Sequence, residues 1–560
     1  MRNRTAITRL VQDFGIEPFM YLSVFSVFIS FIEMAGIASV FPFIELVTNP
    51  EILSTNSYYS DVYMFVGEPE LDDLIITTAL LLVVFFILKV FLSYKFLRYK
   101  TTVLKEFYRH LYYKVYVKYT NMRYVDHQKG DSSRMLKNIT SEIMFVNDYI
   151  SSLINLFTEL ALVISIFTLI MFVNLKVAVG AILILSLKTI VSILIIKPIQ
   201  KRLGIEREST QEVLYSTVNS TLQNIKAVKV FQVTEYFQKI IFTNIFKYAK
   251  LIVHSLVLSE LPKYILELLG FIAIIFVFTY GYYDNGFDSF LPLMTMLALA
   301  FYKLLPSANK IISAYSSLAF NEKALHLIHD ELYCTNDEIT TRTKCKAISN
   351  FEKITFHNVE CRIDNIQLID NISFEINKGE KIALIGESGS GKTTIIDIIL
   401  GLKQITSGEI TINDDIQFSS ICISNWLDMI GYVPQEQLML NSTLKQNIIF
   451  GRRDRFDDSY LINLATRAGI DESILKNRGL NFRIGELGSI LSGGQRQRVS
   501  IARALYNSPE LLIFDEAFSA LDKRTQKMLF DSIITNSDST ILFVTHDQSL
   551  IKYFDRVIEL

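Results

Sequence analysis

The 560-residue sequence has few cysteines and no surplus of basic residues. Its formal net charge is −2 and its isoelectric point is near 6.4, so a phosphate backbone is not an expected ligand, and nucleic acid is excluded as a partner. The four cysteines show no metal-ligand spacing, and we expect free thiols because all of them fall in a stretch that should face the reducing side of the membrane. They are Cys334, Cys345, Cys361 and Cys422.

The chain is also poor in proline and tryptophan, with ten and one respectively, against 40 phenylalanines. Half of the residues are hydrophobic and the mean hydropathy is +0.31. This composition excludes an ordinary soluble enzyme and indicates a chain that needs lipid as its solvent. A bilayer-spanning helix takes about 20 mostly apolar residues. Six segments meet this requirement, at residues 18–47, 74–97, 150–173, 177–196, 261–280 and 290–314.

Charge predicts how the spans are oriented. The segments 98–149 and 197–257 are rich in lysine and arginine, whereas 48–73 contains acids and neither basic residue. Because basic loops stay in the cytoplasm, we expect both termini there and residues 48–73 outside. The first apolar stretch is too long for a cleavable signal and lacks a small-residue cleavage site, so it is expected to remain in the membrane.

The long cytoplasmic segments favour helices that continue beyond the bilayer and turn back. We expect their tips near residues 123–129 and 216–223. The predicted domains are a transmembrane part over 1–320, a polar connector over 321–350 and a final domain over 351–560.

The final domain carries a phosphate loop between a short apolar strand at 381–385 and a helix from Thr394. Glycines let backbone N–H groups turn inward around phosphates, Lys392 neutralises their charge, and the Thr393 hydroxyl is a magnesium ligand. Alone, this loop predicts a nucleotide with Mg²⁺, and the ordered set of motifs that follows it predicts that the nucleotide is ATP. The expected phosphate-binding residues are Gly386, Glu387, Ser388, Gly389, Ser390, Gly391, Lys392, Thr393 and Thr394.

A second apolar strand at 511–514 delivers two acids, Asp515 and Glu516, to its carboxyl end, where open parallel sheets place their ligands. We expect Asp515 to hold magnesium and Glu516 to polarise the attacking water. His546 follows another apolar strand. A single histidine is more often structural, and a single Leu-Ser-Gly-Gly-Gln is an ordinary turn in many chains, so the ordered set carries the prediction.

This ordered set resembles the ATP-binding cassette (ABC) exporters of the half-transporter type. The resemblance implies a membrane α-helical six-span domain fused to a cytoplasmic α/β P-loop domain with an α-helical subdomain. It further implies that Gln435 senses the γ-phosphate and magnesium, that His546 contacts the γ-phosphate, and that residues 519–522 form a loop between two sites. The signature residues would clasp the nucleotide of a second copy, which implies a homodimer. They are Ser492, Gly493, Gly494 and Gln495.

One departure from the family concerns adenine. The family stacks an aromatic residue on the base, whereas Arg362 or Ile363 occupies that place here. An aliphatic face or a stacked guanidinium still binds the base, and we expect weaker base discrimination.

Ionisable residues inside the spans indicate the cargo, because such residues are costly in lipid. Lys303 and Lys310 share a helix face, and Lys188 interrupts the fourth span, with Glu33, Glu159 and Glu267 as nearby acids. The alternative is that these charges pair with one another or reach the headgroups. A cationic lining suits a pyrophosphate head group and a lipid-linked, amphipathic cargo. The proposed substrate residues are Lys89, Lys263, Lys303 and Lys310.

Three stretches, at 26–33, 304–312 and 385–389, resemble the PglK-type lipid-linked oligosaccharide flippases of bacterial protein N-glycosylation. The resemblance implies ATP-driven movement of a polyprenyl-pyrophosphate-linked glycan to the outer leaflet of the inner membrane, with arginines of that family where the four lysines stand here. Two alternatives stay open. One is an exporter of a peptide, another lipid or another amphiphile, although no peptidase domain precedes the first span. The other is an ATP-gated channel, which an intact Glu516 disfavours.

Overall fold

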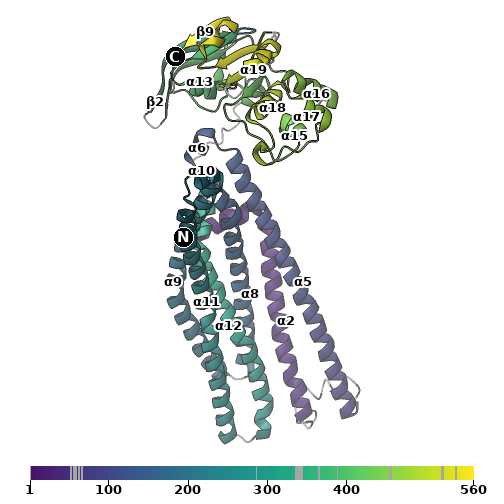
Figure 1. Cartoon of the computed structure of the whole chain (residues 1–560). Helices are drawn as coiled ribbons and strands as arrows, with labels where there is room; N and C mark the ends of the chain where they lie inside the picture. Colours follow the sequence, from purple (N-terminus) through teal and green to yellow (C-terminus); the bar gives the residue numbers. More distant parts are fainter. Residues whose placement is uncertain are drawn as a thin grey trace. The chain divides into compact units, whose positions relative to one another are not determined.

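The computed structural model describes most of the chain (Figure 1). Side chains are not described for parts of six helical segments, over residues 173–185, 266–301, 534–535 and 548 with gaps. Most of the predicted external segment, and the predicted 519–522 loop, lie outside the described residues. The described residues are 2–48, 50, 53, 60, 63–64, 67, 69–173, 175–284, 287–334, 345–363, 366–387, 389–452, 457–518, 523–535 and 539–560.

The chain divides into two compact units. Unit 1 consists of Met1–Met122 and Asp126–Asp337, and unit 2 of Arg123–Val125 and Glu338–Leu560.

Unit 1 is helical in its described part. Each of the six predicted spans lies in a different long helix. Four helices are long and apolar enough to cross a membrane when only described residues are considered, namely Glu17–Thr48, Leu71–Thr120, Ser132–Phe172 and Thr234–Ile265. The helices are α1 (Arg2–Phe14), α2 (Glu17–Thr48), α5 (Leu71–Thr120), α6 (Tyr124–Lys129), α7 (Ser132–Lys137), a π-helical turn (Asn138–Glu142), α8 (Ile143–Val173), α9 (Leu175–Gln223), α10 (Ile225–Val230), α11 (Thr234–Asp284) and α12 (Phe287–Tyr333).

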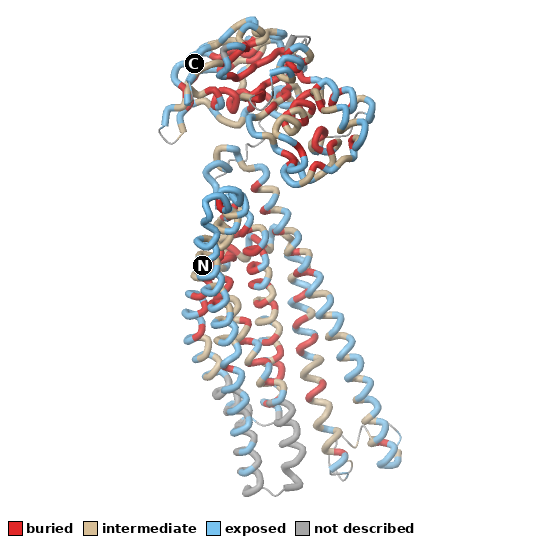
Figure 2. The backbone as a smooth tube through the Cα atoms, viewed as in Figure 1, coloured by how far each residue is buried: buried red, intermediate tan, exposed pale blue. Residues whose placement is uncertain are grey.

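Helix α5 shows why these helices need two different surroundings. In its first half Leu80, Val84 and Ile87 are each more than 60% exposed, and the pale-blue face of α5 in Figure 2 follows this part. An apolar helix that is left uncovered requires lipid or another chain around it. In its second half Phe107 and Leu111, four residues apart, are fully buried among α1, α8 and α12. This half therefore packs as a helix of a soluble bundle does.

Two expectations about the cytoplasmic segments change. Residues 321–333, predicted as connector, continue α12, because Ala324, Leu325 and Ile328 recur at helical spacing and are fully buried. The first predicted tip coincides with α6. The second short helix is α10 at 225–230, whereas residues 216–223 are the last turns of α9.

Unit 2 contains two sheets and several helices. An antiparallel sheet has the order β2-β1-β4-β5, and a sheet of five strands has the order β6-β7-β8-β3-β9. Every pairing recorded in the second sheet is parallel. The strands are β1 (Lys353–Ile363), β2 (Ile366–Asn377), β3 (Lys381–Ile385), β4 (Ser407–Ile412), β5 (Ile416–Gln417), β6 (Ile430–Val433), β7 (Leu511–Asp515), β8 (Thr540–Val544) and β9 (Arg556–Glu559).

The helices of unit 2 fall into two groups. α13 begins at the phosphate loop and α14 directly precedes β6, whereas α15 to α18 form a helical group whose buried residues, among them Leu461, Leu464 and Val499, share one core with residues of β6, β7 and β8. Strands β7 and β8 are buried along their whole length, which explains their continuous apolar sequences. The α-helices are α13 (Lys392–Ile399), α14 (Ile423–Asp428), α15 (Leu444–Ile449), α16 (Asp458–Arg467), α17 (Glu472–Asn477), α18 (Gly493–Leu505) and α19 (Lys523–Leu529).

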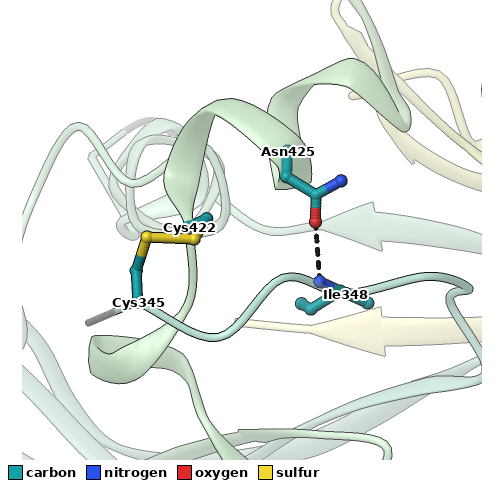
Figure 3. Close-up of a disulfide and its surroundings, with 4 residues drawn as sticks. All are labelled: Cys345, Ile348, Cys422 and Asn425. Carbon is teal, nitrogen blue, oxygen red and sulfur yellow. Dashed lines mark hydrogen bonds between the residues drawn. A yellow bond between two sulfur atoms is a disulfide. The ribbon is translucent and has the colours of Figure 1, made fainter.

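The prediction of four free thiols is wrong for two of them. Cys345 and Cys422 form a disulfide, although 77 positions separate them in the sequence (Figure 3). The reason is tertiary: the backbone of Lys346 pairs with Ile421 in an isolated parallel bridge, which brings the two cysteine Cα atoms to 4.9 Å. Cys334 and Cys361 are free, as predicted.

Candidate functional site

Four neighbouring strands of the parallel sheet end at the predicted nucleotide residues. β3 ends at Ile385 before the phosphate loop, β7 ends at Asp515, and β8 ends two residues before His546. β6 ends two residues before Gln435. Because the strands run in parallel in the order β6-β7-β8-β3, their carboxyl ends lie along one edge. The sheet thus gathers four motifs that are spread over 160 residues of sequence.

The phosphate loop leads into α13. Gly391 precedes the helix with φ of 96°, and a Cβ atom at this position would lie 2.8 Å from the carbonyl oxygen of Leu368, so only glycine fits. The Lys392 ammonium donates hydrogen bonds to the carbonyl oxygens of Gly386 (2.9 Å) and Glu387 (2.7 Å), which fold the side chain over the loop.

Two observations show that this loop fits a phosphate group. The Ser390 hydroxyl oxygen is buried and has no hydrogen-bond partner, which is costly unless a ligand supplies one. Lys392 is 94% buried, and among the described residues its recorded hydrogen bonds go to carbonyl oxygens, with no carboxylate within ion-pair distance. Thr393 is exposed in the first turn of α13, and Thr394 is buried beneath it. Ser388, also predicted to contact phosphate, lies outside the described residues.

Asp515 occupies an electrostatically unfavourable position. The side chain is 94% buried, and burial, followed by the neighbouring charges of Glu516 and Asp397, raises its pKa from 3.8 to about 6. The hydroxyl of Tyr432 donates a long hydrogen bond of 3.5 Å to the carboxylate. A buried carboxylate with so few partners is suited to a cation. Thr393, Gln435 and Asp515 are the residues that would hold Mg²⁺ here.

Glu516 connects two of the other predicted catalytic residues. One carboxylate oxygen lies 2.6 Å from His546 Nε2, and the other accepts a hydrogen bond of 2.9 Å from the Gln435 amide. The backbone of Glu516 has φ of 49°, a left-handed conformation that is strained for a residue other than glycine. The structure therefore brings Gln435, Glu516 and His546 together.

The signature residues form a separate feature. Ser492 precedes α18 and makes a reciprocal capping box with Gln495, so the side chain of each residue bonds the backbone N–H of the other. The Gln495 amide also donates to Asp471 at 2.7 Å. Gly493 and Gly494 are the first two residues of the helix. Among the residues that the structure describes, no recorded hydrogen bond or ion pair joins this capping box to the phosphate loop.

The predicted adenine contacts lie at the end of β1. Arg362 is exposed and pairs with Glu360 at 3.3 Å, and Ile363 pairs with Ile366 at the start of β2. The guanidinium is thus free to turn toward a ligand at the cost of one exposed ion pair, which is a small cost.

The four predicted substrate lysines do not form a single cluster. Lys89 and Lys303 both approach the same oxygen of Glu33, at 2.8 and 3.0 Å. Lys310 instead forms an ion pair of 2.7 Å with Glu159. Three of the lysines are therefore paired with acids in the single chain, which is the alternative that the sequence left open.

Lys263 and Lys310 line a cavity of about 900 Å³ within unit 1. The cavity also contains three acids, two asparagine amides and four serine hydroxyls, most of which the sequence reasoning missed. The available signal was a polar residue at every third or fourth position of an apolar helix. The lining residues are Ser152, Asn155 and Glu159 on α8, Ser259, Glu260, Lys263, Glu267 and Phe271 on α11, and Tyr302, Leu305, Pro306, Asn309, Lys310, Ser313, Ala314 and Ser317 on α12.

Comparison with known proteins decides the family. Residues 20–301, half of the chain, match the ABC transporter transmembrane region, and residues 369–519 match the ABC transporter family. The chain belongs to the ABC transporters. The predicted fold class, a helical transmembrane domain joined to a P-loop nucleotide-binding domain, is thereby confirmed, and this ABC transporter is a multi-pass membrane protein.

A solved structure described as a bacterial Atm1-family ABC exporter with ATP bound is similar in fold, with a TM-score of 0.73 and 21% identity over 97% of this chain and 93% of the other. A putative export ATP-binding/permease protein of Rickettsia felis is 40% identical over 187 residues, which is 32% of each protein. An ATP-dependent lipid A-core flippase of Francisella novicida is 27% identical over 354 residues, or 61% of this chain and 58% of that protein. The aligned part spans about a third of the length of the first of these relatives.

Proposed function

We propose that this ABC transporter is an ATP-driven flippase that moves a polyprenyl-pyrophosphate-linked oligosaccharide from the cytoplasmic to the outer leaflet of a bacterial inner membrane. The observation that carries the proposal is the polar cavity of about 900 Å³ between long apolar helices. A cavity of this kind suits the hydrophilic part of a molecule whose lipid tail remains outside. The absence of Lys and Arg over residues 48–73 supports both termini being cytoplasmic.

ATP hydrolysis follows from the residues at the sheet edge. Lys392 and the backbone of the loop hold the phosphates, and Glu516 accepts a proton from the attacking water while Gln435 and His546 fix its carboxylate. Bound Mg²⁺ neutralises charge on the phosphates. The strained backbone at Glu516 supports such a role, because strain of this kind collects at active sites.

A homodimer is part of the proposal. Within the described residues of one chain, the capping box at Ser492 shares no recorded hydrogen bond or ion pair with the phosphate loop, which supports a second copy bringing the signature to a nucleotide. Each chain carries all of the predicted catalytic residues, so two identical copies give two competent sites. Nucleotide then drives transport only if it binds the closed dimer more tightly than the open one.

The lysines offer two places for a charged head group. At Glu33 two ammonium groups share one carboxylate, which leaves one positive charge in excess for a pyrophosphate. In the cavity, Lys263 and Lys310 lie among amides and hydroxyls, which are the groups that hydrogen-bond sugar hydroxyls. The exposed apolar face of α5 is compatible with a polyprenyl tail in lipid.

A second candidate is an exporter of a zwitterionic or cationic amphiphile. The cavity contains three glutamates against two lysines, so its formal charge is one unit negative. A relative named as a probable multidrug resistance ABC transporter, YheI of Bacillus subtilis, is 35% identical over 209 residues, which is 37% of this chain and 35% of that protein.

The test uses the full-length protein in liposomes with a fluorescent polyprenyl-pyrophosphate glycan. Lys303→Ala and Lys310→Ala are each expected to lower flipping and lipid-stimulated ATPase at least tenfold without changing basal ATPase. The matched control is Lys105→Ala, an exposed lysine on α5. If both variants flip as fast as the control, the glycan proposal fails. Stimulation by a cationic amphiphile alone would establish the second candidate, and ATP-dependent ion current would establish a channel.

A further inference from the structure

The Cys345–Cys422 disulfide lies at the beginning of the described part of unit 2 (Figure 3). Cys345 is exposed, and Cys422 is partly exposed immediately before α14. The bond is therefore open to attack by a thiolate from solution, which is the requirement for thiol–disulfide exchange. A buried structural disulfide would lack this access.

The segment around Cys345 is also held without the bond. Lys346 donates its N–H to the carbonyl of Ser420 and accepts from the N–H of Cys422, both at 2.9 Å. The N–H of Ile348 donates to the Asn425 side chain at 2.6 Å, the contact drawn in Figure 3. These bonds bring the two sulfur atoms near each other again each time the reduced segment closes, so the disulfide is able to form again in the folded protein.

The disulfide occupies the outer end of this series of hydrogen bonds. Cys345 precedes Lys346 directly and is the first residue of the described stretch 345–363. A segment held by separate hydrogen bonds opens one bond at a time from one of its ends, because each bond is individually weak. A covalent bond at that end stops the opening at its first step.

Opening of residues 345–351 would disturb the packing of α14 against α13, the helix that begins at the phosphate loop. Phe351 is fully buried against Trp426 of α14, with ring centroids 5.7 Å apart. The Trp426 indole donates a hydrogen bond of 2.7 Å to the carbonyl of Ile399 at the end of α13, the helix that begins at the phosphate loop. The segment that follows Cys345 therefore packs on residues that support the phosphate loop.

We propose that Cys345 and Cys422 form a reversible redox site whose disulfide clamps residues 345–351 to α14 and whose reduction lets this segment open. A thiol of the glutathione class, or a dithiol protein, is the reductant. Its thiolate attacks one sulfur, the other cysteine leaves as a thiolate and takes a proton, and a second thiol resolves the mixed disulfide. Two cysteine thiols and one oxidised reductant result.

This inference does not depend on the cargo. It uses only the expectation that an ATP-binding unit faces a reducing compartment, where protein disulfides are mostly transient or redox-sensing.

The test compares the full-length protein in oxidised and in reduced glutathione. Alkylation after denaturation, followed by peptide mapping, should find Cys345 and Cys422 linked and unlabelled in the first buffer and both labelled in the second. Amide exchange of peptides covering 345–351 and 420–426 should rise at least tenfold on reduction and return on reoxidation. Cys345→Ser and Cys422→Ser should exchange fast in both buffers.

The matched control is Cys334→Ser, which removes the exposed free thiol and should leave the redox response intact. A bond that persists in reduced glutathione, four free thiols in both buffers, or equal exchange of the two peptides would each overturn the proposal.

Discussion

Replacing Asp515 by asparagine should stabilise the nucleotide-free protein at neutral pH. The folded protein raises the pKa of this carboxyl from 3.8 to about 6, chiefly through burial. Because the folded state holds this proton more tightly than the unfolded state does, the proton stabilises the fold. This contribution to the unfolding free energy is complete below pH 3.8 and is lost as the pH rises through about 6. Asparagine resembles the protonated acid and keeps that stability at every pH.

The magnitude follows from the shift. About two pKa units at about 1.4 kcal/mol each give roughly 3 kcal/mol as an upper value at pH 8. For a domain of the size of unit 2, 1 kcal/mol moves the melting temperature by about 2–4 °C, so we expect the variant to melt roughly 5–10 °C higher at pH 8 and nearly together with wild type at pH 4. The wild-type protein would thus lose unfolding free energy at pH 8 because it keeps a charged metal ligand, Asp515, in a buried position.

The assay is thermal unfolding of the full-length protein in EDTA without nucleotide, at several pH values between 4 and 8. Asp428→Asn serves as the matched control, because Asp428 is exposed in the same unit. Its difference from wild type should not change with pH. A melting difference for Asp515→Asn that is independent of pH, or a destabilised variant at pH 8, would refute the reasoning.

Three further outcomes are expected. Glu516→Gln should lower phosphate release by about 10²–10⁴-fold while ATP binding, measured by filter retention, persists; a loss of less than tenfold would contradict the general-base role. Gly204→Ala should lower the melting temperature and the monodisperse yield, because its Cβ would lie 2.0 Å from the Phe320 carbonyl oxygen, and unchanged melting would show that α9 and α12 separate easily. Trp426→Phe should cost about 2 kcal/mol in unfolding free energy by leaving the Ile399 carbonyl without its donor, and a neutral substitution would show that water replaces the indole.

The sequence alone determined the features that depend on local chemistry. A phosphate loop needs glycines next to a lysine, a strand that ends in two acids needs an apolar run before them, and a membrane span needs about 20 apolar residues. Each of these is readable within one continuous stretch. For this reason the fold class, the approximate positions of the spans and the residues at three of the four strand ends could be predicted, whereas Gln435 was implied by the family resemblance.

Only the tertiary structure decided which distant residues meet. The disulfide depends on the backbone bridge between Lys346 and Ile421, and two of the substrate lysines meet at Glu33 because α2, α5 and α12 bring them there. Neither contact can be predicted from the spacing of residues along the chain. Local sequence fixes which groups are present, but packing of elements far apart in the chain fixes their partners, and partners decide whether a cysteine is free or a lysine is available to a ligand.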